Sequence, residues 1–255
     1  MAKTSHLHQL RTAEAESCFD LLPRLNPKTK ILEIGAGTGL QARLLFEAGF
    51  DVSAVDLTSS AYWGDRVFLV EAYDGSTLPF PDDHFDVIFT SNVLEHVAQL
   101  EMFFLESRRV LKPGGIMVHI VPTPSWRIWS QIAYYPWLLK RAWQLVFTGD
   151  TNAHKTPLAA SPRPNFLLRL ALNLYCPQHG ERGNALDEAL YYRRAFWRGC
   201  FCANGLQILS ESSTGLFYTE AKLLGSQLAI NKRKALAKIL GSSCRVYVVA
   251  TDKRA

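Results

Sequence analysis

Short apolar runs alternate with helical patterns along the first half of the chain. Compact apolar runs predict five strands, at residues 30–34, 52–56, 66–71, 85–90 and 116–121. Apolar residues at helical spacing predict one helix from Gln41 to Ala48 and another from Glu101 to Leu111. Strands that alternate with helices in this way form a mostly parallel sheet with helices packed on its faces.

The second half of the chain breaks this rhythm after Pro122. The residues up to about Glu188 are rich in proline and aromatic side chains and show no clear strand pattern. Regular elements then return, as a helix at 195–203, a strand at 206–211, a helical stretch at 220–240 and a final strand at 245–251. We therefore expect seven strands in a single domain over 1–255, with an N-terminal helical segment at 1–29 and an insertion at 122–195.

Composition and charge indicate a globular protein but do not indicate which partner it binds. The 255 residues are 48% hydrophobic, which is enough for a substantial core, and the formal net charge of +5 is spread along the chain. No continuous apolar stretch opens the sequence, so we expect no secretory signal. The five cysteines lack the spacing of a zinc site or a disulfide framework, and Cys200 and Cys202 are interpreted as packing residues. We expect a cytoplasmic protein with reduced thiols and no metal site.

A glycine-rich loop joins the first predicted strand to the first helix. Glycines at Gly35, Gly37 and Gly39 let the backbone approach a ligand closely. A dinucleotide fingerprint that starts at Gly35 would need glycine at position 40, where Leu40 stands. Glu33, which enters the loop, would repel a pyrophosphate but attract a ligand with ammonium and sulfonium groups. The loop therefore favours S-adenosylmethionine and disfavours a dinucleotide oxidoreductase.

A second carboxylate supports a nucleoside ligand. Asp56 ends the second strand 21 positions after Gly35 (56 minus 35). An acidic residue meets ribose hydroxyls at a spacing of roughly 20 residues in nucleotide-binding α/β folds. The alternative, in which the glycines make only a tight turn and Glu33 and Asp56 are ordinary strand ends, leaves this spacing unexplained.

Three further stretches extend the pattern, at residues 74–88, 91–97 and 109–115. Together with the glycine loop they resemble the class I S-adenosylmethionine-dependent methyltransferases, strongly over 30–121 and more weakly from about 179 onward. The resemblance implies an α/β fold: a Rossmann-like, doubly wound, mostly parallel seven-stranded sheet, here with a helical, aromatic-rich insertion after strand 5. It also implies methyl transfer from S-adenosyl-L-methionine to an acceptor by in-line displacement.

The resemblance assigns roles to individual positions. By it, the cofactor-binding residues are Glu33, Gly35, Ala36, Gly37, Gly39, Asp56, Leu57, Asp74, Gly75 and Asn92. Glu33 would lie near the methionine amine, Asp56 on the ribose hydroxyls and Leu57 against the adenine. Asp74 would accept a hydrogen bond from the adenine amino group, although Asp-Gly is also a common turn dipeptide. Asn92 would face the methionine portion or the reacting centre. The connection at 58–64 departs from the family pattern, because it leaves little room for a helix beside the adenine.

Histidine is the natural general base for a hydroxyl acceptor near neutral pH. The candidates are His96, His119, His154 and His179. His179 and Glu181 belong to a His-Gly-Glu motif that resembles one found in small-molecule members of the family, and with His96 they form the expected catalytic set. The alternatives are a packing role for His96, a loop turn at His179 and a buried structural role for His119.

The insertion carries an unusual density of aromatic residues. Four of the six tryptophans lie between 126 and 147, interspersed with the cations Arg127, Lys140 and Arg141. These cations and Pro136 argue against a transmembrane helix, but aromatic and basic residues together suit a helix at a membrane interface. A lid over an apolar acceptor and two helices packed on the sheet edge are the alternatives, and residues 165–175 supply a second apolar stretch. We therefore expect either an acceptor lid or a peripheral membrane contact through 126–175.

Two other functions remain open at this point. A non-catalytic interaction protein with a nucleoside-binding fold is one, although suitable residues fill every expected cofactor position. A nucleic-acid methyltransferase is the other, but residues 90–94 lack the Asn/Asp-Pro-Pro-aromatic motif, and the chain has no Pro-Cys nucleophile. A small-molecule or lipid-like acceptor is the better interpretation.

Overall fold

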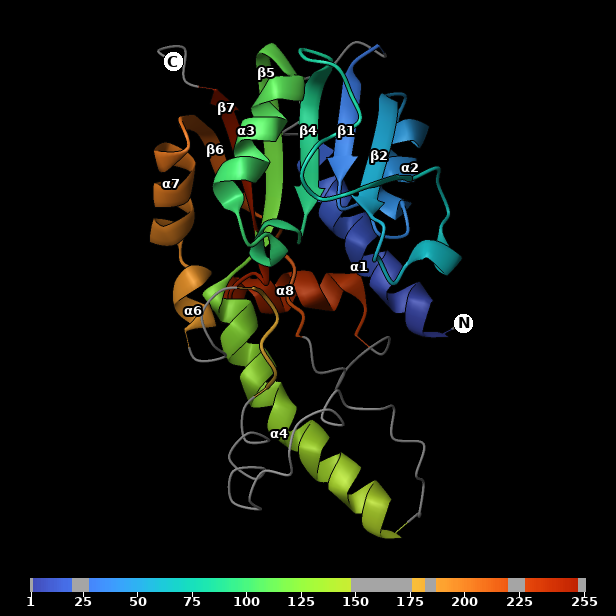
Figure 1. Ribbon diagram of the computed structural model, residues 1–255. Helices are drawn as coiled ribbons and strands as arrows, with labels where there is room; N and C mark the ends of the chain where they lie inside the picture. Colours follow the sequence, from blue (N-terminus) through green and yellow to red (C-terminus); the bar gives the residue numbers. More distant parts are fainter. Residues whose placement is uncertain (1, 20–27, 148–175, 182–186, 220–227, 252–255) are drawn as a thin grey trace, which may run out of the picture.

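The computed structural model describes residues 2–19, 28–147, 176–181, 187–219 and 228–251, which form a sheet covered by helices on both faces (Figure 1). The strands are β1 (Lys30–Ile34), β2 (Asp51–Leu57), β3 (Glu71–Tyr73), β4 (Phe85–Ser91), β5 (Leu111–Pro122), β6 (Leu206–Ser213) and β7 (Cys244–Thr251). The helices are α1 (Ala2–Phe19), α2 (Leu40–Glu47), α3 (Leu100–Val110), α4 (Pro124–Phe147), α6 (Glu188–Tyr191), α7 (Arg194–Ala203) and α8 (Ile230–Leu240). Short 3-10 turns occur at η1 (Trp63–Asp65) and η2 (Leu94–His96).

The sheet has the order β3-β2-β1-β4-β5-β7-β6. Neighbouring strands are parallel except β7, which runs antiparallel to both β5 and β6. The expected Rossmann-like, mostly parallel seven-stranded sheet is therefore confirmed. Because the chain moves outward from β1 in one direction and from β4 in the other, the loops after these two strands diverge. Open α/β sheets bind their ligands at such a switch point.

Two hydrophobic clusters hold the helices against the sheet. On one face Phe104 of α3 and Phe201 of α7 pack with Leu32 of β1, and on the other Leu45 of α2 packs with Ile31. Successive residues of β1 thus enter opposite layers, and both are fully buried. A sheet buried on both faces needs apolar residues at consecutive positions, and this is why the central strands are nearly continuous apolar runs.

The third strand is not where the sequence pattern predicts it. Residues 66–70 form no strand, and β3 covers only Glu71–Tyr73. Val67 donates its N–H to Thr38 O at 2.8 Å, and Phe68 and Val70 pack closely against Gly39. The apolar run predicted as a strand therefore covers the glycine loop instead of pairing with β2.

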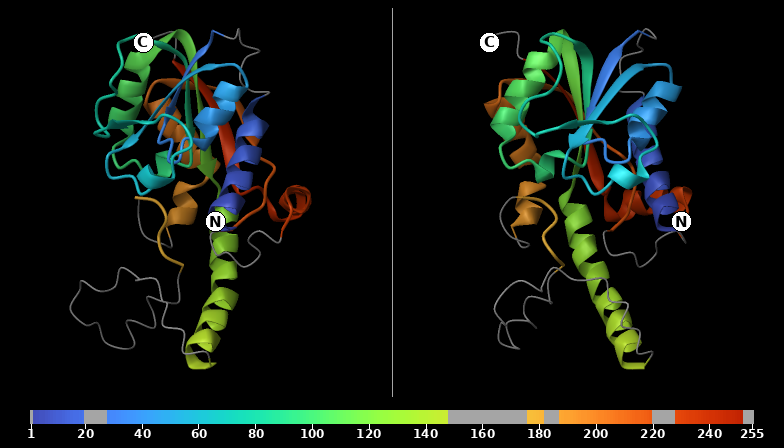
Figure 2. Two further views of the ribbon diagram at one scale, coloured as in Figure 1. Left: turned by 90° about the vertical axis from the view of Figure 1, so that its right-hand side faces the viewer. Right: turned by 45° about the vertical axis from the view of Figure 1, so that its right-hand side comes forward.

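Two further expectations are refined. Within the predicted helical stretch at 220–240, α8 begins at Ile230, after the extended Ala229; residues 220–227 lie outside the described residues. The insertion opens with α4, a helix of 24 residues that contains Pro136 and projects away from the sheet (Figures 1 and 2). The second apolar stretch at 165–175 also lies outside the described residues. Among the helices that are described, none has both the length and the apolar character needed to cross a bilayer.

Candidate active site

The glycine loop is folded tightly at the carboxyl end of β1. The N–H groups of Gly35 and Ala36 both donate to Val55 O of β2, at 2.9 and 3.1 Å. Gly35, Gly37 and Gly39 all have positive φ, at 74°, 57° and 75°. A Cβ at Gly35 would lie 2.5 Å from Val93 Cγ2. The loop therefore requires glycine both for its backbone angles and for its contact with the residues after β4.

Asp56 ties the middle of this loop to the end of β2. One carboxylate oxygen, Oδ2, accepts hydrogen bonds from Gly37 N at 2.9 Å and from the Ser60 hydroxyl at 2.7 Å. The other oxygen accepts the N–H of Leu57 at 2.8 Å. The structure thus brings Asp56 to the glycine loop, as the spacing predicts. The contact with ribose hydroxyls stays a prediction.

Two of the expected adenine neighbours lie in contact. A Cβ at Gly75 would be 2.9 Å from Leu57 Cδ2, and the Leu57 side chain is 41% exposed. Asp74 Oδ1 accepts the N–H groups of Ser76 and Thr77, at 2.8 and 2.9 Å. These bonds make Asp74 a turn residue and lower its pKa to about 2, so its carboxylate is ionised at neutral pH. Its contact with the adenine amino group stays a prediction.

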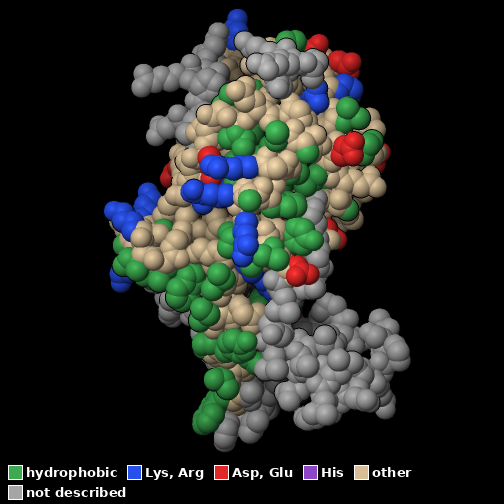
Figure 3. Space-filling model, turned by 90° about the vertical axis from the view of Figure 1, so that its left-hand side faces the viewer, with side chains coloured by type: hydrophobic (Ala, Val, Ile, Leu, Met, Phe, Trp, Pro, Cys, Tyr) green, Lys and Arg blue, Asp and Glu red, His purple; other side chains and the backbone are tan. Residues whose placement is uncertain are grey.

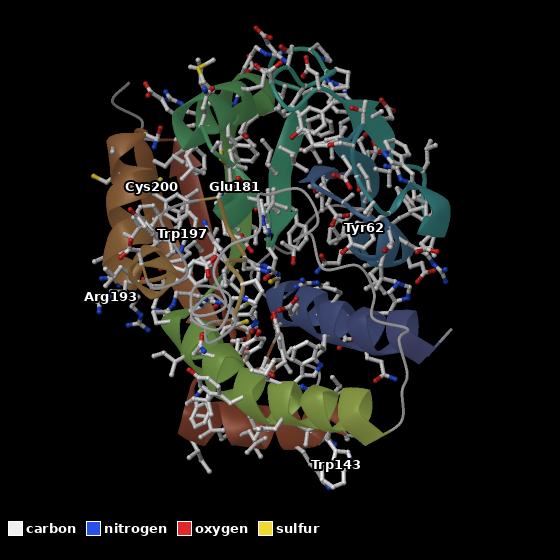
Figure 4. The ribbon with its side chains drawn as sticks, turned by 60° about the horizontal axis from the view of Figure 1, so that its bottom comes forward. Tyr62, Trp143, Glu181, Arg193, Trp197 and Cys200 are labelled. Carbon is white, nitrogen blue, oxygen red and sulfur yellow. The ribbon has the colours of Figure 1, made fainter. Side chains whose placement is uncertain are left out.

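The connection between β2 and β3 contains one 3-10 turn, η1, and no α-helix. This agrees with the expectation that residues 58–64 leave little room for a helix. Tyr62, labelled in Figure 4, precedes this turn, and its ring lies 3.5 Å from the position that a Cβ at Gly37 would take. An aromatic side chain from this connection therefore borders the glycine loop.

Glu33 is a buried acid at the base of the loop. Its side chain is 2% exposed, and its Oε2 finds no hydrogen-bond partner among the described residues. Burial raises the pKa of Glu33 to about 8; the charge of Asp56 adds to this, and a hydrogen bond from the Ala42 backbone opposes it. An ammonium group nearby would favour the ionised form, which is the chemistry expected of this position.

Asn92 follows β4 and belongs to a chain of polar groups that the sequence does not reveal. Its backbone is left-handed, with φ 55°, and its Oδ1 accepts a hydrogen bond from Cys244 Sγ at 3.3 Å. Cys244 Sγ lies 2.9 Å from the Tyr218 hydroxyl, which donates to Glu14 Oε1 of α1. Arg11 pairs with the same Glu14. The N-terminal helix is therefore connected to the site through side chains.

Two candidate histidines, far apart in the sequence, lie side by side. The ring centroids of His96 and His179 are 4.8 Å apart, and Trp126 stands 4.7 Å from His179. The carboxylate beside them is that of Glu95. One of its oxygens lies within 4.8 Å of a ring nitrogen of each histidine. Burial raises the pKa of Glu95 to about 7, although the nearby His179 opposes this shift.

Glu181, the expected companion of His179, lies at the surface (Figure 4). Its backbone N–H donates to Glu95 O at 2.9 Å, and a Cβ at Gly180 would be 2.8 Å from the same oxygen. The segment at 179–181 thus runs closely along η2. A catalytic role for Glu181 stays a prediction, as does one for each histidine.

The segment that carries His179 is held by buried side chains of α4 and α6. Arg127 donates to the carbonyl oxygens of Cys176 and Pro177, at 2.8 and 3.1 Å. Glu188 accepts the N–H groups of His179 and Gly180, at 2.6 and 2.5 Å. Arg127, predicted as one of the cations of an interfacial helix, is therefore a buried structural residue, and that interpretation of it is wrong. The reason is that its helix begins inside the fold.

The remaining candidates do not contribute to this site. His119 is fully buried in β5, where it shares a 2.8 Å hydrogen bond with Thr90, and burial lowers its pKa to about 3. His154 lies outside the described residues. None of the five cysteines, all within the described residues, forms a disulfide. Cys200 on α7 packs against the core as predicted, whereas the packing role predicted for Cys202 is wrong, because its side chain is exposed.

Comparison with known proteins shows the family to which this chain belongs. A family model described as a methyltransferase domain matches residues 32–119. An uncharacterized methyltransferase of Synechocystis sp. is 30% identical over 147 residues, which are 52% of this chain and 69% of that protein. A biotin biosynthesis bifunctional protein of Cellvibrio japonicus is 32% identical over 142 residues, 54% of this chain. The chain spans only 26% of that relative's length.

The fold also matches a solved structure over nearly its whole length. A geranyl diphosphate C-methyltransferase from Streptomyces coelicolor A3(2), in complex with Mg²⁺, geranyl diphosphate and S-adenosyl-L-homocysteine, superposes with a TM-score of 0.52. The match covers 95% of this chain and 80% of that one, at 18% identity. At this identity the likeness shows the fold alone.

Proposed function

The chain belongs to the class I S-adenosylmethionine-dependent methyltransferases, and from this premise we propose that it methylates a small or lipid-like acceptor. The observation that carries the cofactor part of this proposal is the hydrogen bond from Gly37 N to Asp56. It joins the glycine loop to the acid that is expected to bind the ribose. The loop follows β1 at the switch point of the sheet, where such folds bind nucleosides, and Asp56 lies near the end of the neighbouring strand β2.

The residues around the loop fit S-adenosylmethionine by charge. Glu33 and Asp56 are both buried, and the charge of Asp56 contributes to the raised pKa of Glu33. A ligand that brings an ammonium and a sulfonium group would offset this repulsion, whereas a pyrophosphate would add to it. When bound, the cofactor supplies the methyl group and leaves as a neutral thioether.

The acceptor end of the site is proposed to lie beside His96 and His179. Methyl transfer needs an acceptor atom aligned with the methyl group, so residues that position the acceptor supply much of the catalysis. His179 is fixed by Glu188 and by the ring of Trp126, and both of these side chains are buried. We assign His179 and His96 to contact with the acceptor, with Glu181 at the surface beside them.

An apolar acceptor is supported by α4. Its exposed apolar side chains are Ile128, Ile132, Tyr135, Leu139 and Trp143, which recur at spacings of three and four residues and so share one face. Figure 3 shows hydrophobic side chains gathered along this helix, and Trp143 points away from the body in Figure 4. Geranyl diphosphate, which is bound in the similar solved structure, joins an apolar geranyl chain to a diphosphate. We propose that this face contacts a lipid surface from which the acceptor is taken.

Calorimetric titration tests the cofactor assignment. We expect S-adenosylmethionine to bind the full chain with one-to-one stoichiometry and NAD not to bind. Asp56→Asn should weaken binding at least tenfold, because the NH2 group that replaces one carboxylate oxygen cannot accept the hydrogen bond that Gly37 or Leu57 donates to that oxygen. The matched control is Asp51→Asn at the exposed start of β2. Equal affinity in both variants would mean that the ribose contact is misplaced, and binding of NAD alone would overturn the function.

A further inference from the structure

Glu95, His96 and His179 form a compact group of potential metal ligands at the carboxyl end of the sheet. Two of them lie in η2, directly after β4, and the third comes from the segment at 176–181. One ligand atom from each lies within 4.8 Å of the other two. Two imidazoles and a carboxylate are a donor set that first-row transition metals and zinc prefer.

Glu95 supplies an independent indication that a ligand belongs here. Its side chain is 2% exposed, and neither carboxylate oxygen has a hydrogen-bond partner among the described residues. A buried carboxylate whose oxygens accept no hydrogen bond is costly, because the hydrogen bonds it made to water are not replaced. A cation between Glu95 and the histidines would offset that cost.

The surrounding residues hold the third ligand in place. Glu188 accepts the backbone N–H of His179, and the Trp126 ring packs on its imidazole. A second layer that orients the ligands is a regular property of metal sites. His179 is thus positioned by groups that do not themselves reach the proposed ion.

We propose that Glu95, His96 and His179 bind one divalent transition-metal ion of the zinc type. Bonds of about 2.1 Å keep two ligands of one ion within about 4.2 Å of each other, so small side-chain rotations close the site. His96 is exposed and His179 partly exposed, which gives the ion a path of entry.

Three protein ligands leave coordination positions open, which is the arrangement of catalytic rather than structural sites. This use of the ion rests on the proposed function: an acceptor hydroxyl or carboxylate would meet a positive charge beside the methyl donor. An acceptor hydroxyl there would lose its proton more readily than in water. Ion binding itself needs no acceptor and can be measured alone.

The test uses the tag-free full chain, stripped of metal with a chelator and dialysed. Co²⁺ is titrated first, because a site with nitrogen ligands gives visible absorption bands, and Zn²⁺ is then added to displace it. We expect one ion per chain. His96→Ala, His179→Ala and Glu95→Gln should each weaken binding at least tenfold. His84→Ala is the matched control, because His84 precedes β4 and lies at the opposite end of that strand.

Each variant is also titrated with S-adenosylmethionine, which reports on folding and on the cofactor site separately. Loss of metal binding with cofactor binding intact supports the metal site. Absence of a bound ion in the unmodified chain, or equal affinity in the four variants, overturns it and leaves the methyltransferase assignment standing. Failure of the unmodified chain to bind the cofactor overturns the proposed function instead.

Discussion

Arg127 and Glu188 form an ion pair that is almost completely enclosed by the fold: Arg127 Nε lies 3.1 Å from Glu188 Oε2, and the side chains are 4% and 1% exposed. The pair joins α4 to α6, and both partners also bind the backbone that carries His179. It therefore holds the segment that carries His179 by charge as well as by hydrogen bonds.

Arg127→Met should destabilise the protein strongly. Removing one partner of a buried pair leaves an uncompensated charge, which costs about 3–5 kcal/mol of unfolding free energy. The matched control is Arg43→Met, because the Arg43–Glu47 pair is 51% exposed on both sides and contributes at most about 1 kcal/mol. Urea denaturation measures both changes. An equal decrease in unfolding free energy in the two variants would show that the buried pair stabilises the protein no more than the exposed pair does.

Gly35→Ala should abolish cofactor binding, because the new Cβ would meet Val93 Cγ2 at 2.5 Å. Gly49→Ala is the control: Gly49 also has positive φ, at 99°, but a Cβ there meets nothing within 4 Å. Both variants carry the backbone strain and only the first carries the clash. Adding Val93→Ala removes the clashing methyl groups and should restore part of the affinity, measured by calorimetry. A double variant no better than Gly35→Ala would contradict this explanation.

Stability without cofactor should fall as the pH rises between about 4.5 and 8, in part because of Glu33. The pKa of this acid rises to about 8 in the folded chain from a reference of 4.5. In that window the unfolded state has lost the proton and the folded state retains it, so stability declines by up to about 1.4 kcal/mol per pH unit.

Glu33→Gln removes this contribution, so its stability advantage over the unmodified chain should grow from pH 5 to pH 8. Urea denaturation at three pH values measures it, and Glu47→Gln on the exposed side of α2 serves as the control. Parallel profiles for the unmodified chain and Glu33→Gln would show that Glu33 ionises normally.

The apolar face of α4 should govern adsorption to lipid. Leu139→Glu with Trp143→Glu places charges on side chains that are 72% and 64% exposed. Flotation with phosphatidylcholine vesicles containing phosphatidylglycerol should recover much less of this variant than of the unmodified chain, because charged groups resist burial at the interface. Leu69→Glu is the control, since Leu69 is 79% exposed but does not belong to α4. It lies between Phe68 and Val70, which pack against the glycine loop. Equal recovery of all three would exclude a lipid contact through α4.

The nucleotide-binding half of the fold could be predicted from local patterns. The strands β1, β2, β4 and β5 are apolar runs followed by turn residues, and the glycine loop has its own spacing. The predicted third strand is wrong because Phe68 and Val70 pack against Gly39 of the glycine loop, while Val67 and Leu69 are exposed, and none of these residues pairs with β2. A run that covers a loop and a run that joins a sheet look the same in sequence.

The acceptor side of the site could be predicted only in part. His96 and His179 were selected by residue type, but Glu95 was passed over although it stands beside His96. Its burial and its lack of partners follow from how the segment at 176–181 crosses η2. Likewise, the sequence does not indicate that Arg127 and Glu188 form an ion pair. The two residues are far apart in the sequence, and the contact depends on the position of α4 relative to α6.

A series of polar side chains connects Glu14 through Tyr218 and Cys244 to Asn92, so truncation of the N-terminal helix would affect the site. A variant that starts at β1 would keep the sheet and the glycine loop. It would nevertheless leave the Tyr218 hydroxyl, beside Cys244, without the Glu14 carboxylate that accepts its hydrogen bond. The first helix is thus linked through side chains to Asn92, and its removal would act on this residue directly after β4.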